Sequence, residues 1–367
     1  MERVKVETPA QTAPHESSAP ILKDVISPAP REIWSEIYYQ DPKALVTQKP
    51  DWVDAVCQVT GGRDASRLYM FNDGQRVLLP FVKHDLPLGI SAVLSSYRNS
   101  WGIGGVIAKN PVRQEELELV LADLNRLSEI RYSIRPNPLD GRLWEAALVP
   151  GVEKRPRAAH VLNLEGGFGD VWERRFKSVA RTAVRKAERS GLVVEKDTTG
   201  RLLPVFYQLF ETSLARWGSQ QNEPLFLSRF RGHQRDPIRK FEAISERLKQ
   251  AFQIWIAWLD GQPAAGIIVL QETNAYYTRG AMDKSLAGPS RANDLLHRMA
   301  IEDACLAGCR FYHMGESGTS KSLSSFKSNF GAEAFEYPEI YHERLPLTRV
   351  ETALRGMVKK LIGFKDA

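Results

Sequence analysis

Residues 254–280 read IWIAWLDGQPAAGIIVLQETNAYYTRG, and this stretch decides the fold. Two apolar runs, residues 254–259 and 267–270, flank Asp260-Gly261, a dipeptide favoured in two-residue hairpin turns. Asn274 marks a second turn, and the residues from Ala275 onward have the composition of a third strand. The sequence therefore predicts an antiparallel meander of three strands.

A helix and a further strand follow this meander. A predicted loop containing Gly288 and Pro289 precedes residues 292–307, whose apolar side chains recur at helical spacing. Gly308 is suited to the end of that helix, because glycine adopts the left-handed conformation common there. Residues 310–314 then resume as a strand. The expected fold class is α/β, an α+β arrangement built on a mixed sheet.

The first half of the chain repeats this order less clearly. Residues 68–71, a turn at Asn72-Asp-Gly74 and residues 77–82 read as two strands of a meander. A helix predicted for residues 111–127 follows, and then a short strand at residues 132–135. We therefore predict a degenerate tandem duplication, in which each copy is a mainly antiparallel meander followed by a helix and a strand.

Composition divides the chain into four segments. Residues 1–30 are rich in Pro, Ala, Ser and Thr and are predicted to be a disordered leader. Residues 31–156 and 157–345 are the two predicted domains. Residues 346–367 read as a basic amphipathic helix, a tail that either docks onto the body or rests on the inner surface of an acidic membrane.

The charge balance favours a polyanionic partner. The 367 residues carry a net charge of +6 with a pI near 9.1, which suits a nucleic acid, a phosphorylated substrate or an acidic membrane surface. The three cysteines have no further ligands at metal-binding spacing, so no metal is expected. No secretory signal or 18-residue apolar run is present, which predicts a cytoplasmic protein.

A helix predicted for residues 170–190 carries an unusual stripe of cations. They recur every four residues and so lie along one side of the helix: Lys177, Arg181, Arg185 and Arg189. Like charges at this spacing repel, and a bound anion would relieve the repulsion. The stripe, with the adjoining Lys186, either binds phosphate or is a solvated surface.

Two motifs resemble a known family. The first is Arg181-x-x-Val-Arg-Lys-Ala-Glu-Arg-Ser-Gly-Leu, and the second is Gly315-Glu-Ser-Gly318 followed by Leu323-x-x-Phe326-Lys327-x-x-Phe330-Gly331. Their order and spacing are similar to those of FemAB-like proteins, a branch of the GNAT acyltransferase superfamily also classed as BioF2-like acetyltransferases. The likeness covers about residues 157–342, with weaker traces in the first half such as Gly104-Gly105. It implies tandem GNAT-like domains, the second of which holds most of the active site.

The resemblance implies transfer of an acyl or aminoacyl group to an amine. On the family pattern Lys327 matches a lysine near the reacting carbonyl, where a fixed cation stabilises the negative charge that builds on oxygen. The alternative is a surface lysine anchored by Phe326 and Phe330. Phe326 is also a candidate to line the donor site.

The donor depends on the residues before the 292–307 helix. CoA-dependent GNAT proteins have a glycine-rich loop there that binds pyrophosphate through backbone N–H groups. In this chain the loop has one glycine, Gly288, and Pro289 has no N–H to donate. The sequence therefore favours aminoacyl-tRNA over acyl-CoA as the donor co-substrate, and no tightly bound cofactor is expected.

Four residues are candidates for the acceptor side of the reaction. Asp283 and Glu316 end predicted strands, where each acts either as the general base or as a salt-bridge or capping residue. Tyr277 and Arg279 share one face of a strand and line the pocket or pack at a domain junction.

The predicted function is that of a FemAB-like N-acyltransferase acting on an amine of a cell-wall, polysaccharide or peptide acceptor. Two alternatives remain at this stage. One is an acyl-CoA-dependent GNAT N-acetyltransferase, and the other is a non-catalytic module that binds RNA or phosphate.

Overall fold

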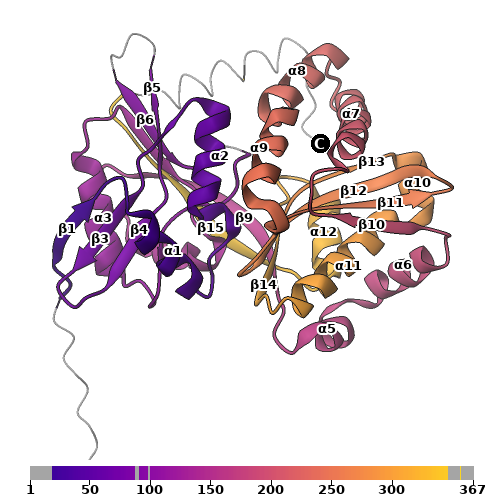
Figure 1. Ribbon diagram of the computed structural model, residues 1–367, viewed down its shortest axis with the longest axis horizontal. Coiled ribbons are helices and arrows are strands. Elements are labelled where there is room, and N and C mark those ends of the chain that lie inside the picture. Colours follow the sequence, from indigo (N-terminus) through magenta and orange to yellow (C-terminus); the bar gives the residue numbers. More distant parts are fainter. Residues whose placement is uncertain (1–18, 87–90, 98–99, 346–355, 357–367) are drawn as a thin grey trace, which may run out of the picture.

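The chain folds into two halves joined through one long sheet (Figure 1). The computed structural model describes residues 19–86, 91–97, 100–345 and 356. The first half contains β1 (Leu22–Ile26), α1 (Arg31–Gln40), α2 (Pro50–Thr60), β2 (Arg63–Asp64), β3 (Arg67–Phe71), β4 (Arg76–Leu79), β5 (Val82–Asp85), β6 (Ala92–Ser96), β7 (Ile107–Ala108), α3 (Gln114–Arg126), β8 (Arg131–Ile134) and α4 (Gly141–Ala146). The second half contains β9 (Glu153–Asn163), α5 (Gly167–Asp170), α6 (Ser178–Glu188), β10 (Val193–Asp197), α7 (Leu203–Gln220), α8 (Leu225–Arg235), α9 (Ile238–Leu248), β11 (Phe252–Leu259), β12 (Gln262–Gln271), β13 (Ala275–Met282), α10 (Lys284–Ser290), α11 (Ala292–Leu306), β14 (Phe311–Glu316), α12 (Lys321–Asn329) and β15 (Glu333–Glu343).

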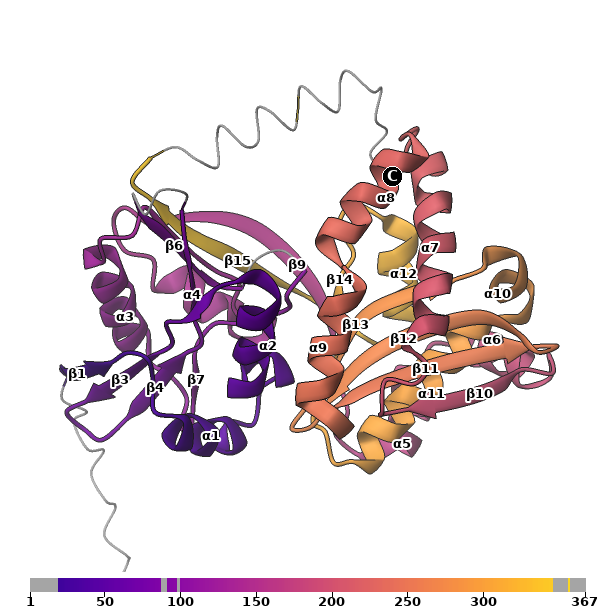
Figure 2. The same cartoon turned by 45° about the horizontal axis from the view of Figure 1, so that its top comes forward.

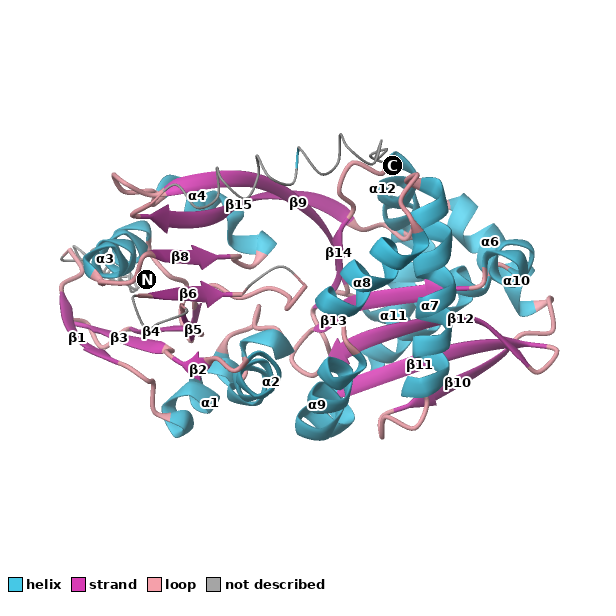
Figure 3. Cartoon of the chain, turned by 90° about the horizontal axis from the view of Figure 1, so that it is seen from above, coloured by secondary structure: helices cyan, strands magenta, loops and turns pink. Residues whose placement is uncertain are grey.

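The long sheet has eleven strands in the order β10-β11-β12-β13-β14-β9-β15-β8-β6-β5-β2. The strand β15 pairs with β9 on one side and with β8 on the other. Figure 3 shows β9 and β15 passing from one half to the other, and β9 runs across the predicted domain boundary at residues 156–157. A second sheet, β1-β3-β4-β7, lies in the first half. The predicted mixed, mainly antiparallel sheet is confirmed.

The two halves repeat one unit. In the second half β12 and β13 are antiparallel, α10 and α11 follow, and β14 returns parallel to β13. In the first half β5 and β6 are antiparallel, α3 follows, and β8 returns parallel to β6. The predicted tandem arrangement is therefore confirmed, although the strand expected at residues 77–82 is interrupted at Pro80. A proline has no N–H to continue a strand ladder, and the chain changes sheet there.

The central strands are apolar throughout because both of their faces are covered. Ile254 and Ile256 of β11 pack with residues of α7 and α9. The alternate residue Trp255 and its neighbour on β12, Ile267, pack with residues of α11. A strand buried on both faces reads as a continuous apolar run, which explains the sequence of residues 254–259.

One apolar core spans the junction between the halves. It includes Trp34 and Trp52 of the first half and Phe241 and Phe252 of the second. The predicted turn residue Asn274 adds a polar link, since its side-chain amide donates to the carbonyls of Pro42 and Ala44, each at 3.0 Å. The halves are therefore held by both apolar packing and specific hydrogen bonds.

The predicted leader is shorter than residues 1–30. Residues 22–26 form β1, which pairs with β3, so pairing satisfies backbone groups that were expected to face water. Residues 1–18 and the predicted tail helix, apart from Gly356, lie outside the described residues. In the part of the chain that is described, no helix is both long enough and apolar enough to cross a membrane.

The single helix predicted for residues 170–190 is wrong. The structure has α5, a π-helical turn over Val171–Arg175, an extended residue at Phe176, and then α6. A residue distant in the sequence stabilises the break, because the N–H of Lys177 donates to the carbonyl of Asn329 at 2.8 Å. After this break Val179, in the first turn of α6, faces solvent with 62% exposure.

Candidate active site

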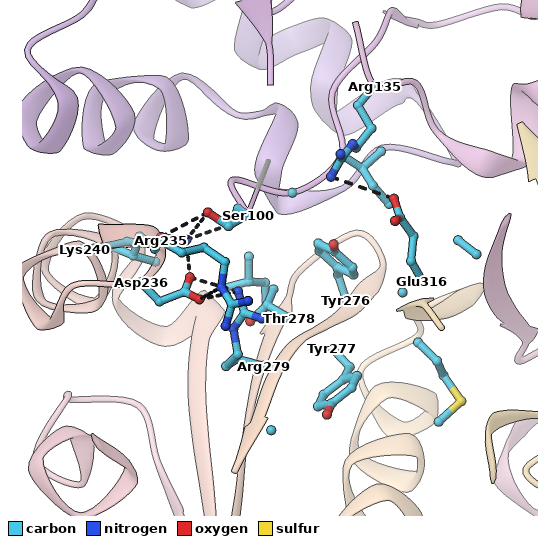
Figure 4. Close-up of a pocket in the computed structure, with 18 of the residues that line it drawn as sticks. Ser100, Arg135, Arg235, Asp236, Lys240, Tyr276, Tyr277, Thr278, Arg279 and Glu316 are labelled. Atoms are coloured by element: carbon cyan, nitrogen blue, oxygen red, sulfur yellow. Dashed lines mark hydrogen bonds and ion pairs between the residues drawn. The ribbon is translucent and has the colours of Figure 1, made fainter. Parts of the chain in front are cut away.

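The parallel strands β13 and β14 separate soon after they begin to pair. They are paired at Ala275 with Tyr312 and at Tyr276 with His313. Beyond these positions both strands line a cavity of about 370 Å³, and residues of the first half form its opposite wall (Figure 4). Strands that diverge leave backbone groups without a partner in the middle of a sheet, where a substrate can reach them.

The equivalent position in the first half is closed. There β6 and β8 stay paired to their ends, with Ser96 opposite Ile134. A glycine segment fills the space beside them: the N–H of Gly104 donates to the carbonyl of Arg135 at 2.8 Å, and that of Gly105 to Ser96 Oγ at 3.0 Å. A Cβ on Gly104 would lie 2.3 Å from Ser96 Oγ, so the approach requires glycine. Of these two equivalent positions in the described residues, the one in the second half is therefore open. We call this opening, where β13 and β14 diverge, the splay.

Lys327 lies at the opening between β13 and β14. Its side chain extends from α12 and is 2% exposed. The Nζ atom donates to the carbonyls of Gly315 at 2.9 Å and Glu316 at 2.7 Å, both at the diverging end of β14. An ammonium has three N–H donors, so one remains for a ligand in the cavity that Lys327 lines. Burial lowers the pKa of Lys327 to about 8, although Glu316 opposes this effect.

Glu316 also lines the cavity, but its carboxylate is engaged. The hydroxyl of Tyr337 donates to Oε1 at 2.6 Å. The guanidinium of Arg157 lies 3.5 Å from Oε2, and that of Arg135 lies 3.8 Å from Oε1. Arg157 is bound in turn by Glu339, whose Oε2 accepts from Nε at 2.9 Å. Two arginines and a hydroxyl hold this carboxylate, so the contacts favour the salt-bridge alternative for Glu316.

A second charged group lies across the cavity, around Asp236 (Figure 4). This buried carboxylate contacts three cations: Arg279 Nη2 at 2.7 Å, Lys240 Nζ at 2.8 Å and Arg235 Nε at 2.7 Å. Burial would raise the pKa of Asp236, but the three cations outweigh it and hold that pKa well below its usual range. Burial lowers the pKa of Lys240 to about 8. We call these four residues the Asp236 cluster; it has two more positive than negative charges.

The residues of β13 face different surroundings. Tyr277 and Arg279 both line the cavity, but a bulge in β13 separates them. The ring of Tyr277 packs against the buried His297, with ring centres 4.6 Å apart, whereas Arg279 reaches Asp236. Figure 4 shows Tyr276, between the Asp236 cluster and the Arg135–Glu316 pair. Burial raises the pKa values of both tyrosines to about 12, so both are neutral hydroxyls at neutral pH.

Comparison with known proteins identifies the second half. Residues 174–328 match the family model described as an acetyltransferase (GNAT) domain. This protein contains a GNAT acyltransferase domain. No curated protein sequence matches the chain.

Solved structures extend the likeness to both halves. The crystal structure of FemX is similar over 89% of this acyltransferase and 99% of that chain, with a TM-score of 0.64 and 13% identity. A conserved protein of unknown function from Bacteroides thetaiotaomicron is similar over 88% of this chain and 99% of that chain, with a TM-score of 0.52 and 11% identity. At such low identity the likeness shows the fold alone, and this fold extends over both halves of the chain.

The basic stripe of the GNAT acyltransferase does not reach the cavity. Arg181 turns inward, where Nη1 donates to the carbonyls of Trp172 at 3.1 Å and Glu173 at 3.0 Å, and also to that of Phe176. It therefore binds the carbonyl end of the preceding π-helical turn, which is where a helix end attracts cations. The other candidates of the stripe are exposed: Lys177, Arg185 and Lys186. Of the described residues that line the cavity, none belongs to this stripe.

Three further candidates also lie away from the cavity. Asp283 caps α10, since its Oδ1 accepts from the backbone N–H of Ser285 at 2.8 Å, and this bonding lowers its pKa. Gly288 is exposed within α10, which replaces the predicted loop. Phe326 packs in the core against His297 and Phe330, with ring centres 5.4 Å and 5.2 Å away. None of these three is among the described residues that line the cavity.

The Asp236 cluster was missed in the sequence. Its signal was the run Arg235-Asp-Pro-Ile-Arg-Lys240, in which two cations flank an aspartate at short helical spacing. The helix containing Arg235, α8, was also not predicted, because its large apolar side chains face solvent and form no core stripe. Arg135 and Tyr276 were missed because nothing in their local sequence marks a cavity wall.

Proposed function

We propose that this GNAT acyltransferase transfers an aminoacyl group from aminoacyl-tRNA to the amine of an acceptor that carries an anionic group. A cell-wall precursor, a charged polysaccharide and a peptide all fit this description. The observation that carries the proposal is the position of Lys327, a buried ammonium at the splay of β13 and β14 with one N–H left for a ligand.

The reaction needs stabilisation of negative charge at one oxygen. The acceptor amine attacks the ester carbonyl of the donor, and a C–N bond forms while the carbonyl oxygen becomes negative. An ammonium fixed by two carbonyls stabilises that oxygen without having to reorganise. The carbonyl then re-forms, the C–O bond to the tRNA ribose breaks, and the proton lost by the amine ends on the released hydroxyl.

The residues around α10 favour a donor other than acyl-CoA. A pyrophosphate at a helix N-terminus needs free backbone N–H groups there. In this chain the N-terminus of α10 is already capped by its own Asp283 carboxylate. The following helix α11 begins directly after Arg291, and Pro289 has no N–H to offer. A glycine-rich phosphate loop is therefore replaced by a capped helix.

The Asp236 cluster supports an anionic acceptor. The described lining of the cavity holds five cationic side chains and two acidic ones, Asp236 and Glu316. Arginine suits phosphate and carboxylate oxygens because its planar fork donates in pairs. A phosphate or carboxylate of the acceptor, bound at Arg235 and Arg279, would place its amine in the same cavity as Lys327.

An acyl-CoA-dependent N-acetyltransferase is the alternative within the superfamily, because a GNAT domain implies some acyl donor. The purified protein should be incubated with charged tRNA and, separately, with acetyl-CoA, using uncharged tRNA and free CoA as controls. We expect a thermal shift and label transfer with charged tRNA only. Label transfer from acetyl-CoA, with none from tRNA, would overturn the proposed donor. Binding of tRNA without any transfer would point to the non-catalytic module instead.

A further inference from the structure

The helix α8 presents an apolar surface to solvent. Its inner side meets α7 through two small residues: Ser228 Oγ donates to the carbonyl of Leu214 at 2.9 Å, and a Cβ on Gly232 would lie 2.6 Å from the same leucine. On the outer side Phe226 is 74% exposed and Phe230 is 59% exposed. These two phenylalanines are four residues apart, so they are adjacent on one face of the helix.

Cations outnumber acidic residues in this segment of the sequence. Residues 225–240 contain five Lys and Arg residues and one acidic residue, the buried Asp236, whereas the whole chain has a net charge of only +6. Arg229 and Arg231 stand on either side of the phenylalanines by helical spacing. Each is paired with a glutamate: Arg229 with Glu211 of α7 at 3.4 Å, and Arg231 with Glu223 of the loop before α8 at 2.8 Å.

We propose that the outer face of α8, defined by Leu225, Phe226 and Phe230 with Arg229 and Arg231, docks onto an anionic phospholipid surface. Phenylalanine and leucine enter the boundary between headgroups and acyl chains, while flanking arginines bind lipid phosphates. The α8 face has both the apolar and the cationic side chains that such a surface needs. Leu225 is 45% exposed beside the two phenylalanines, and cations flank them.

The position of α8 links this surface to the cavity. Arg235, the last residue of α8, lines the cavity and belongs to the Asp236 cluster. A docked α8 would therefore hold the cavity next to the lipid headgroups. Figure 2 shows α8 at the upper side of the second half.

A single-stranded nucleic acid also binds aromatic and basic surfaces, by stacking of its bases. The α8 face is less suited to this role, because only two of its three apolar side chains have a ring on which a base could stack. Nucleic-acid binding at α8 is therefore an outcome of the test rather than the proposal.

Flotation with vesicles tests the proposal on the full chain. Vesicles of equal parts phosphatidylglycerol and phosphatidylcholine should float the protein, and vesicles of phosphatidylcholine alone should not. The double variant Phe226→Ser and Phe230→Ser should bind the anionic vesicles at least about tenfold more weakly. Leu306→Ser is the matched control, because Leu306 is an 83% exposed apolar residue on a different helix, α11, and its loss should leave flotation unchanged.

Several results would overturn the proposal. One is equal flotation of the double variant and the parent, which would assign any binding to another surface such as residues 346–367. A second is loss of flotation by a chain ending at Leu345, which would place the binding on the removed segment. A third is loss of tRNA binding in the double variant without any vesicle binding by the parent. Transfer to a soluble acceptor should survive the double substitution, which separates this test from that of the proposed function.

Discussion

Lys327→Met would remove the ammonium from the splay between β13 and β14 while keeping a side chain of similar length. Burial lowers the pKa of Lys327 from 10.5 to about 8. One pH unit of pKa corresponds to about 1.4 kcal/mol, so keeping this lysine charged at neutral pH costs the folded state about 3 kcal/mol.

The substitution also removes two hydrogen bonds. The carbonyls of Gly315 and Glu316 lose their lysine donor, which costs about 1–3 kcal/mol for each group left unsatisfied. This loss opposes the gain from removing a buried charge, so the free energy of unfolding should change by no more than about 3 kcal/mol. The catalytic effect has no such compensation: loss of one preorganised donor to an oxyanion lowers kcat by about 10²–10³.

Two measurements on the same preparation test this reasoning. Urea unfolding gives the stability, and single-turnover label transfer from the donor gives the rate of the chemical step. We expect a near-native unfolding midpoint with a rate at least about a hundredfold lower. A variant that transfers at the parent rate would refute the role of Lys327. A variant that unfolds several kcal/mol more easily would show that the lysine is mainly structural.

Four other outcomes follow from the same geometry. The value of kcat/KM should fall as pH rises through about 8, because Lys327 acts as an ammonium and its pKa in the folded state is about 8; a flat profile from neutral to alkaline pH would contradict this. Asp236→Asn should lower the free energy of unfolding by about 3–5 kcal/mol, since it leaves buried Lys240 without its counter-charge; a loss below about 1 kcal/mol in urea would show that the cluster is well solvated. Asp283→Ala should cost about 1 kcal/mol of stability through the lost cap of α10 and leave kcat within about twofold, whereas a large loss of kcat would restore Asp283 as a general base. Arg235→Gln should raise KM for an anionic acceptor by about tenfold, and the neighbouring exposed Arg239→Gln, which is outside the described cavity lining, should not; equal effects would place the anion elsewhere.

Much of the fold could be predicted because it depends on local patterns. The buried strands β11 and β12 are long apolar runs around Asp260-Gly261, and α11 has a regular apolar stripe that ends at Gly308. What could not be predicted depends on contacts between distant residues. The predicted helix is interrupted at Phe176 because the backbone N–H of Lys177 donates to the carbonyl of Asn329. No residue near position 176 indicates that interruption.

The residues of the candidate site likewise fall into those that local sequence predicts and those that only contacts between distant residues bring together. Lys327 and Glu316 belong to motifs that resemble a family pattern, and both line the cavity. The Asp236 cluster brings together residues of α8, α9 and β13. In the sequence its members are charged residues with no pattern that distinguishes them from surface residues. For the basic stripe the reverse holds. Its regular spacing suggests a phosphate site in the sequence, but in the structure Arg181 binds the chain's own carbonyls.

The central claim is that acyl transfer takes place at the splay of β13 and β14, with Lys327 at the reacting carbonyl. The most direct test is a crystal structure with a short tRNA acceptor-end mimic whose aminoacyl ester is replaced by an unreactive amide. The account predicts that the amide oxygen lies about 3 Å from Lys327 Nζ, within hydrogen-bond distance. A mimic bound along Lys177 and Arg185, with its carbonyl outside the cavity, would contradict it.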